Sequence, residues 1–125
     1  MERLWIGLGA LAGLCAVAFA AIAAHALGGY GAAAQAMVQS ALRMQGWHAL
    51  ALLATGLWAR RGGRLAHAAG ACFALGIVAF CGAVYALALG GVHLGILAPT
   101  GGMLLMAGWA LLGVSAFRAE LGKGG

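Results

Sequence analysis

The chain has 125 residues, of which 65% are hydrophobic and 7% charged, with a mean hydropathy of +1.02 and a formal net charge of +5. A soluble domain usually carries about 25% charged residues, so this composition excludes a globular domain bathed in water on all sides. A bilayer admits helices or closed barrels, and the apolar runs here are about 20 residues long, not the roughly 10 of barrel strands. We therefore expect an all-α, polytopic membrane protein.

Four apolar segments follow one another along the chain. The first covers about 4–27, which exceeds the roughly 7–15 residues of a signal-peptide core, so we expect it to remain as a span. The second is densest over about 42–59, with a polar-flecked lead-in at 32–41. The third covers about 66–89 and the fourth about 97–117. We expect a single membrane domain, residues 1–125, built as a bundle of four transmembrane helices.

Positive charge predicts how these segments are oriented. Basic residues gather before the first segment, between the second and third, and after the fourth: Arg3, Arg60, Arg61, Arg64, Arg118 and Lys123. By the positive-inside rule, both termini and the middle link are cytoplasmic. The basic residues are spread over segment ends, so we expect no nucleic-acid partner. Arginine in place of lysine and heavy alanine and glycine usage suit a GC-rich bacterial genome, which indicates a bacterial inner membrane. Trp5 and Trp58 lie at segment ends, where we expect interfacial anchors.

Small residues at helical spacing indicate where the helices pack, because close backbone approach drives association in lipid. The first segment carries Gly9 and Gly13, in a GxxxG pattern. The later segments carry further small residues, namely Gly82, Ala86 and Gly90 in the third and Gly101, Gly102, Ala107 and Gly108 in the fourth. A tight bundle follows from this pattern.

The stretch "LRMQGWHALALLATG" at 42–56 places polar residues inside the second segment. At about 100° per residue, one helix face carries Gln45, His48, Leu52 and Thr55, while Arg43 points nearly opposite. Arg43 lies close enough to the outer headgroups to extend its side chain towards them. Gln45 and His48 lie deeper, so we expect them to turn inward.

Other segments bring further polar groups to the same outer half of the bundle. The candidate intramembrane polar site is therefore His25, Gln45, His48, Tyr85 and Thr100. Two interpretations stay open. These side chains bond to one another as links between helices, or they form a site for a small molecule, an ion or a proton.

Catalysis and cofactor binding find little support in the sequence. The two acidic residues, Glu2 and Glu120, lie at the ends of the chain, so no span offers a carboxylate for acid–base chemistry. Cys15, Cys72 and Cys81 lie in apolar runs without CxxC spacing, which indicates buried reduced thiols. We expect no catalytic residues, no cofactor and no metal site.

Four patches resemble a family of small membrane proteins catalogued as domain of unknown function 423, which includes bacterial YgdD-like proteins and animal transmembrane protein 256. The patches are "AIAAHAL" at 21–27, "QGWHALALL" at 45–53, "FCGAVYALAL" at 80–89 and "APTGGMLLMAGW" at 98–109. The residues that match the family's motifs are Ala24, His25, Gln45, His48, Phe80, Gly82, Tyr85, Pro99, Gly101, Gly102, Gly108 and Trp109.

The chain also departs from that family's pattern. Arg43 stands where the motif has an acidic residue, and both serines near Tyr85 are absent. A function that needs a carboxylate at position 43 is thereby excluded. The resemblance implies four membrane helices and no established activity.

Our leading hypothesis is a non-enzymatic structural or interaction protein that packs in the bilayer against itself, as a homo-oligomer, or against a larger membrane complex. The first alternative is a binding or transport site for a small molecule, an ion or a proton in the outer half of the bundle. The second is lipid binding, since Arg60, Arg61 and Arg64 could attract anionic headgroups.

Overall fold

The computed structural model describes residues 1–122 and is helical over nearly all of them. Its elements in chain order are α1 (Glu2–Ala26), the short 3-10 helix η1 (Leu27–Gly29), α2 (Ala32–Gly90) and α3 (Leu97–Leu121). These three α-helices are long and apolar enough to cross a membrane. At about 1.5 Å per residue, α1 measures about 37 Å, which exceeds a hydrocarbon core of about 30 Å. The expectation of an all-α membrane protein is confirmed.

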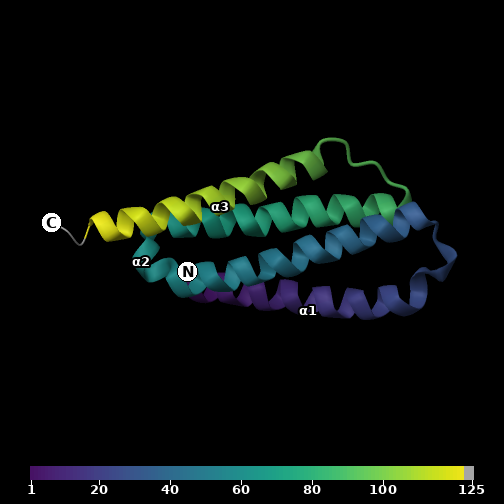
Figure 1. Cartoon of the computed structure of the whole chain (residues 1–125), viewed down its shortest axis with the longest axis horizontal. Helices are drawn as coiled ribbons and strands as arrows, with labels where there is room; N and C mark the ends of the chain where they lie inside the picture. The colour runs from purple at the N-terminus through teal and green to yellow at the C-terminus, as the bar shows by residue number, and fades with distance from the viewer. Residues whose placement is uncertain (123–125) are drawn as a thin grey trace.

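The second and third expected segments lie within the single helix α2, which folds back on itself at Gly63 (Figure 1). Gly63 has φ 58° and ψ −142°, a backbone conformation outside the helical region. The first arm of α2 (32–62) and its second arm (64–90) lie side by side, and the Cys81 thiol of one donates to the Ala41 carbonyl of the other over 3.5 Å. The expected link "RRGGR" is therefore helical except at Gly63, and the expected lead-in at 32–41 belongs to the first arm.

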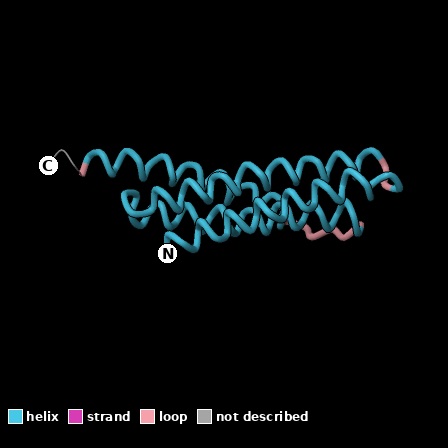
Figure 2. Tube along the Cα trace, turned by 90° about the horizontal axis from the view of Figure 1, so that it is seen from below, coloured by secondary structure: helices cyan, strands magenta, loops and turns pink. Residues whose placement is uncertain are grey.

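Both remaining connections lie at the end of the bundle opposite this bend (Figures 1 and 2). At the first connection, the Gln35 side-chain amide donates to the carbonyl oxygens of Leu27 and Tyr30, at 2.9 and 2.8 Å. At the second, Gly91 ends α2 in the left-handed region, and the Val92 N–H donates to the Ala86 carbonyl over 3.2 Å. The Gly91 N–H also donates to the Leu87 carbonyl over 3.1 Å, which is the αL type of helix ending and satisfies carbonyls that the last helical turn leaves free.

The central element of the bundle is α2, because α1 and α3 both pack against it. The backbone of α1 approaches α2 at Gly9, where an added Cβ would lie 2.9 Å from the Ala49 carbonyl oxygen. The backbone of α3 approaches α2 at Gly101 and Gly108, where an added Cβ would meet the Phe80 backbone and the Phe73 ring. These contacts agree with the predicted role of small residues. The prediction is wrong for Gly82, which meets no atom within 4 Å at its Cβ position.

Candidate functional site

The predicted polar face of α2 is buried as expected. Gln45, His48, Leu52 and Thr55 expose 5%, 6%, 1% and 0% of their surface. Thr55 donates to the Ala51 carbonyl, one turn earlier, over 2.7 Å. Arg43, predicted to lie on the opposite side of the helix, is exposed. Helical periodicity therefore located the inward face of the first arm correctly.

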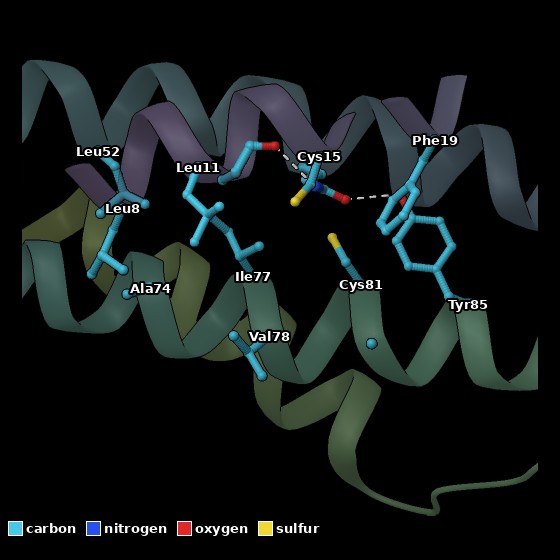
Figure 3. Close-up of a pocket in the computed structure, with 13 residues that line it drawn as sticks. Leu8, Leu11, Cys15, Phe19, Leu52, Ala74, Ile77, Val78, Cys81 and Tyr85 are labelled. Carbon is cyan, nitrogen blue, oxygen red and sulfur yellow. Dashed lines mark hydrogen bonds between the residues drawn. The ribbon is translucent and has the colours of Figure 1, made fainter. Parts of the chain in front are cut away.

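Gln45 links α1 to both arms of α2. The Tyr85 hydroxyl donates to Gln45 Oε1 over 2.9 Å, and Gln45 Nε2 donates to the Ala12 carbonyl over 2.9 Å (Figure 3). The Phe19 ring meets the Tyr85 ring edge-on, with centroids 5.5 Å apart. A single amide thus joins three helical segments in an apolar environment, where polar groups without partners are costly.

His48 has a different set of partners. The Trp109 indole donates to His48 Nε2 over 3.1 Å, and His48 Nδ1 lies 2.6 Å from the Met44 carbonyl oxygen. An indole can only donate, so Nε2 must accept and Nδ1 must carry the proton. The His48 ring also packs against Phe73 and Trp109, with centroids 5.9 Å from each. Both ring nitrogens of a neutral imidazole are therefore engaged inside the bundle.

The predicted cluster of five residues is only partly assembled. Gln45 and Tyr85 are bonded to each other, whereas His48 bonds to Trp109 on α3. Three residues along a helix correspond to about 300°, so Gln45 and His48 point some 60° apart and reach different neighbours. The structure does not bring His25 or Thr100 to this cluster, because both are exposed. His25 follows the buried Ala23 by two residues, which turns it to the far side of α1.

The His48 geometry predicts a specific tautomer. In bilayer samples labelled with 15N at histidine, we expect His48 to show a protonated Nδ1 and an unprotonated Nε2. Trp109→Phe removes the donor while keeping an aromatic ring, so we expect the Nε2 resonance to shift while the other histidines keep theirs. A wild-type His48 with its proton on Nε2 would contradict the assignment.

The Tyr85–Gln45 bond predicts a coupling energy in a double-mutant cycle. We expect the changes in free energy of unfolding caused by Tyr85→Phe and Gln45→Leu to depart from additivity by about 0.6 kcal/mol. The departure should be at most about 1.7 kcal/mol, the upper value for such hydrogen bonds in a membrane protein. SDS titration of the protein in bicelles measures the free energy of unfolding for each variant. Pairing Gln45→Leu with Trp109→Phe is the control, because those two side chains share no bond. Full additivity in the Tyr85–Gln45 cycle would mean that the bond contributes nothing.

A second set of cross-links, which sequence reasoning missed, lies near the bend of α2. The Trp5 indole donates to His67 Nδ1 over 2.9 Å, and the Trp58 indole donates to the Ser115 hydroxyl over 2.9 Å. Trp5, expected as an interfacial anchor, is only 6% exposed, so its ring packs inside the bundle. Gly70 faces the Trp5 ring and leaves it room. A buried tryptophan usually finds one hydrogen-bond acceptor for its indole N–H. The signal in the sequence that could have indicated these bonds was the presence of polar residues, His67 and Ser115, on other segments.

An apolar groove runs between α1 and the second arm of α2 (Figure 3). Its volume is about 350 Å³, and Gln45 and Leu52 of the first arm also line it. The walls carry mostly apolar side chains, with the sulfur atoms of Cys15 and Cys81 pointing towards one another in Figure 3. A smaller cavity of about 160 Å³ begins at the Phe19–Tyr85 pair and follows the same seam to Leu27 and Leu89.

The chemistry that these groups offer is hydrogen bonding and apolar contact. Within residues 1–122, each buried side-chain nitrogen or oxygen has a hydrogen-bond partner. Over the same residues, no group of three or more histidine, cysteine, aspartate or glutamate side chains could hold a metal ion. Cys15, Cys72 and Cys81 are free thiols. The buried polar side chains thus bond to neighbouring helices or to the backbone of their own helix.

The chain is similar to known membrane proteins over nearly its whole length. A family model described as "Protein of unknown function (DUF423)" matches residues 19–102. A UPF0382 membrane protein of Haemophilus influenzae is 33% identical over 96% of this chain and 98% of its own length. The UPF0382 inner membrane protein YgdD of Escherichia coli K12 is 35% identical, over 95% of this chain and 93% of its own. No solved structure gives a significant match.

Proposed function

Because the chain belongs to the DUF423 family of membrane proteins of unknown function, we propose that it acts by association within the membrane and not by catalysis. It would cross the bilayer four times, with both termini in the cytoplasm. The fold-back of α2 at Gly63 supports the four crossings, because each arm of α2 is long enough to span. Exposed Arg60, Arg61 and Arg64 flank the bend and support its cytoplasmic placement. The name of the Escherichia coli relative supports the inner membrane as the location.

The observation that carries association is a set of helical glycines whose Cβ positions face open space. An added Cβ would meet no atom within 4 Å at Gly7, Gly46, Gly82 or Gly113. Glycine within a helix costs about 0.5–1 kcal/mol relative to alanine, so each of these positions weakens its helix without benefit to the isolated bundle. Close approach by a helix of another protein would use them, as glycines are used at helix contacts in membranes.

The buried polar groups support the same function through rigidity. Gln45, His48 and Tyr85 tie helices to one another and leave no free ring nitrogen on His48 for an ion or a proton. We therefore favour interhelical bonding over the alternative of a transport site for these residues. A bundle with fixed helix positions presents constant outer faces, which binding to a partner requires.

Association is tested in native membranes by crosslinking and native mass spectrometry. We expect the wild type to form homo-oligomers or a larger complex. Gly7→Leu, Gly46→Leu and Gly113→Leu each place a large side chain on a different helix, and we expect at least one to abolish the assembly. Leu57→Ile, on an exposed position, is the control that keeps a lipid-facing aliphatic side chain. Isolated monomers alone in the wild type would refute association.

Topology is tested separately with short tags at both termini and with a tag inserted after Gly91. In intact spheroplasts, an impermeant reagent should reach only the tag after Gly91. Access to either terminal tag would overturn the four-crossing arrangement, whatever the state of assembly.

A further inference from the structure

Two tryptophan indoles in this chain donate to histidine rings, and the two histidines differ in how they are enclosed. His48 accepts from Trp109 inside the bundle, where its second ring nitrogen is also engaged. His67 accepts from Trp5 over 2.9 Å, near the bend of α2, and is only half-buried. No partner for His67 Nε2 lies within residues 1–122, and since the buried polar side-chain atoms there all have partners, Nε2 reaches the surface.

The bond between Trp5 and His67 fixes the protonation state of the histidine. An indole N–H only donates, so His67 Nδ1 must accept, and the ring must be neutral with its proton on Nε2. A charged imidazole holds a proton on both nitrogens and accepts at neither. The gain of one proton by His67 therefore removes the acceptor of the Trp5 indole.

Loss of that acceptor affects a side chain that is packed inside the bundle. Trp5 is 6% exposed, and its ring lies against Gly70, where an added Cβ would lie 2.6 Å from the indole. A buried donor without a partner is unfavourable, because it has given up water and gained nothing in return. At the membrane surface the indole N–H regains an acceptor while its ring stays in an apolar environment. Protonation of His67 therefore favours movement of Trp5 out of its buried position.

The attachment of α1 near the bend depends on Trp5. The buried residues of α1 are Trp5, Gly9 and Ala23, so Trp5 is the one large side chain that α1 places fully inside the bundle. An ion pair over 2.9 Å also joins Glu2 to Arg60, but their side chains are 36% and 83% exposed. Ion pairs on an exposed surface add little stability. Release of Trp5 thus loosens the first turns of α1.

The charged groups at this end of the bundle offer no replacement for the lost bond. They are the Met1 amino group, Glu2 and Arg3 at the start of α1, Arg60 and Arg61 of the first arm of α2, Arg64 of its second arm, and Arg118 and Glu120 of α3. Cations outnumber acids in this set, and the one ion pair formed over residues 1–122 does not include His67. A proton on His67 therefore adds charge to a positive region without gaining a carboxylate partner.

We propose that the hydrogen bond from Trp5 to His67 is a pH-sensitive latch between the start of α1 and the bend of α2. With neutral His67 the latch is closed and Trp5 lies against Gly70. With protonated His67 the latch is open and Trp5 moves to the membrane surface. Histidine is the side chain whose charge ordinarily changes between pH 5 and 8, so the latch responds to the pH of the compartment that the bend faces. It is a property of the single chain and does not depend on association with other proteins.

The test follows the indole N–H of Trp5 in the full-length protein, labelled with 15N at tryptophan, in bicelles at pH 8 and pH 5. Trp5→Phe assigns the resonance, and the Trp58 indole is the internal reference, because its acceptor, Ser115, does not titrate. We expect protection of the Trp5 N–H from deuterium exchange, relative to that of Trp58, to fall several-fold at pH 5. Unchanged relative protection would overturn the proposal, and so would equal loss at both indoles, which would report unfolding of this end of the bundle.

Substitutions at His67 separate the latch from other effects of pH. The amide oxygen in His67→Gln can accept from Trp5 and does not titrate, so we expect Trp5 to stay protected at both pH values. His67→Leu lacks an acceptor, and we expect low protection of Trp5 at both. His93→Gln, the same change at an exposed histidine in the connection before α3, is the matched control and should keep the wild-type response. A pH response that persists in His67→Gln would refute the latch.

Discussion

Replacement of Gly101 by alanine is expected to lower the free energy of unfolding by about 3 kcal/mol, near the upper end of the usual cost of overpacking. The added methyl group would meet the backbone nitrogen of Phe80 and lie 2.8 Å from its Cα atom. Backbone atoms of a helix cannot rotate away as a side chain can, so α3 must move off the second arm of α2. Because packing and hydrogen bonds hold helices together in lipid, such a separation is not recovered by burial elsewhere.

The adjacent glycine provides the control for this prediction. At Gly102, an added Cβ would lie 3.9 Å from the nearest atom, on the Phe80 ring, which is ordinary contact. Gly102→Ala should therefore be neutral or stabilising by up to about 1 kcal/mol, through better helix propensity. SDS titration in bicelles measures both variants, and equal effects would show that the contact at Gly101 is not tight.

Replacement of Gly63 by alanine is expected to lower the free energy of unfolding by about 1–3 kcal/mol. The cause is conformational, because no atom lies within 4 Å of the Cβ position, while φ is 58°. A side chain at this φ and ψ clashes with its own backbone, and glycine alone adopts the conformation without cost. The fold-back of α2 depends on this one residue.

Gly113→Ala is the control for Gly63→Ala, because it adds the same methyl group at an open position with helical backbone. We expect it to be neutral or slightly stabilising. If Gly63→Ala proved as stable as Gly113→Ala in the same titration, the bend would not require glycine at this position.

The sequence predicted the helical membrane fold because composition and apolar run length leave few alternatives in a bilayer. Periodicity also identified the inward face of the first arm, including Gln45 and His48. The hydrogen-bond partners of Gln45 and His48 could not be predicted. A rotation of about 60° about the axis of α2 decides whether a side chain meets α1 and the second arm of α2, or instead meets α3. Trp109 was noted as a motif residue, yet its role as the donor to His48 depends on how α3 packs against α2.

Small-residue spacing was informative at Gly9, Gly101 and Gly108 and misleading at Gly82. A chain with 23 glycines offers such spacings on several helix faces, and spacing alone does not say which face meets a neighbour. The bend at Gly63 was anticipated as a link, but its compactness was not, since "RRGGR" is equally compatible with a loop. The groove depends on the distance between α1 and the second arm, which no local pattern contains.

The cross-links from Trp5 to His67, from Trp58 to Ser115 and from Glu2 to Arg60 all join segments at the end of the bundle that carries the bend. At the opposite end, the cross-bonds that Gln35 makes stay within the η1–α2 connection. Hydrogen bonds between helices thus hold the bundle together at the end that carries the bend, and thermal separation of the helices should begin at the opposite end. In lipid, the rate of backbone amide hydrogen exchange should therefore increase along every helix with distance from the end that carries the bend.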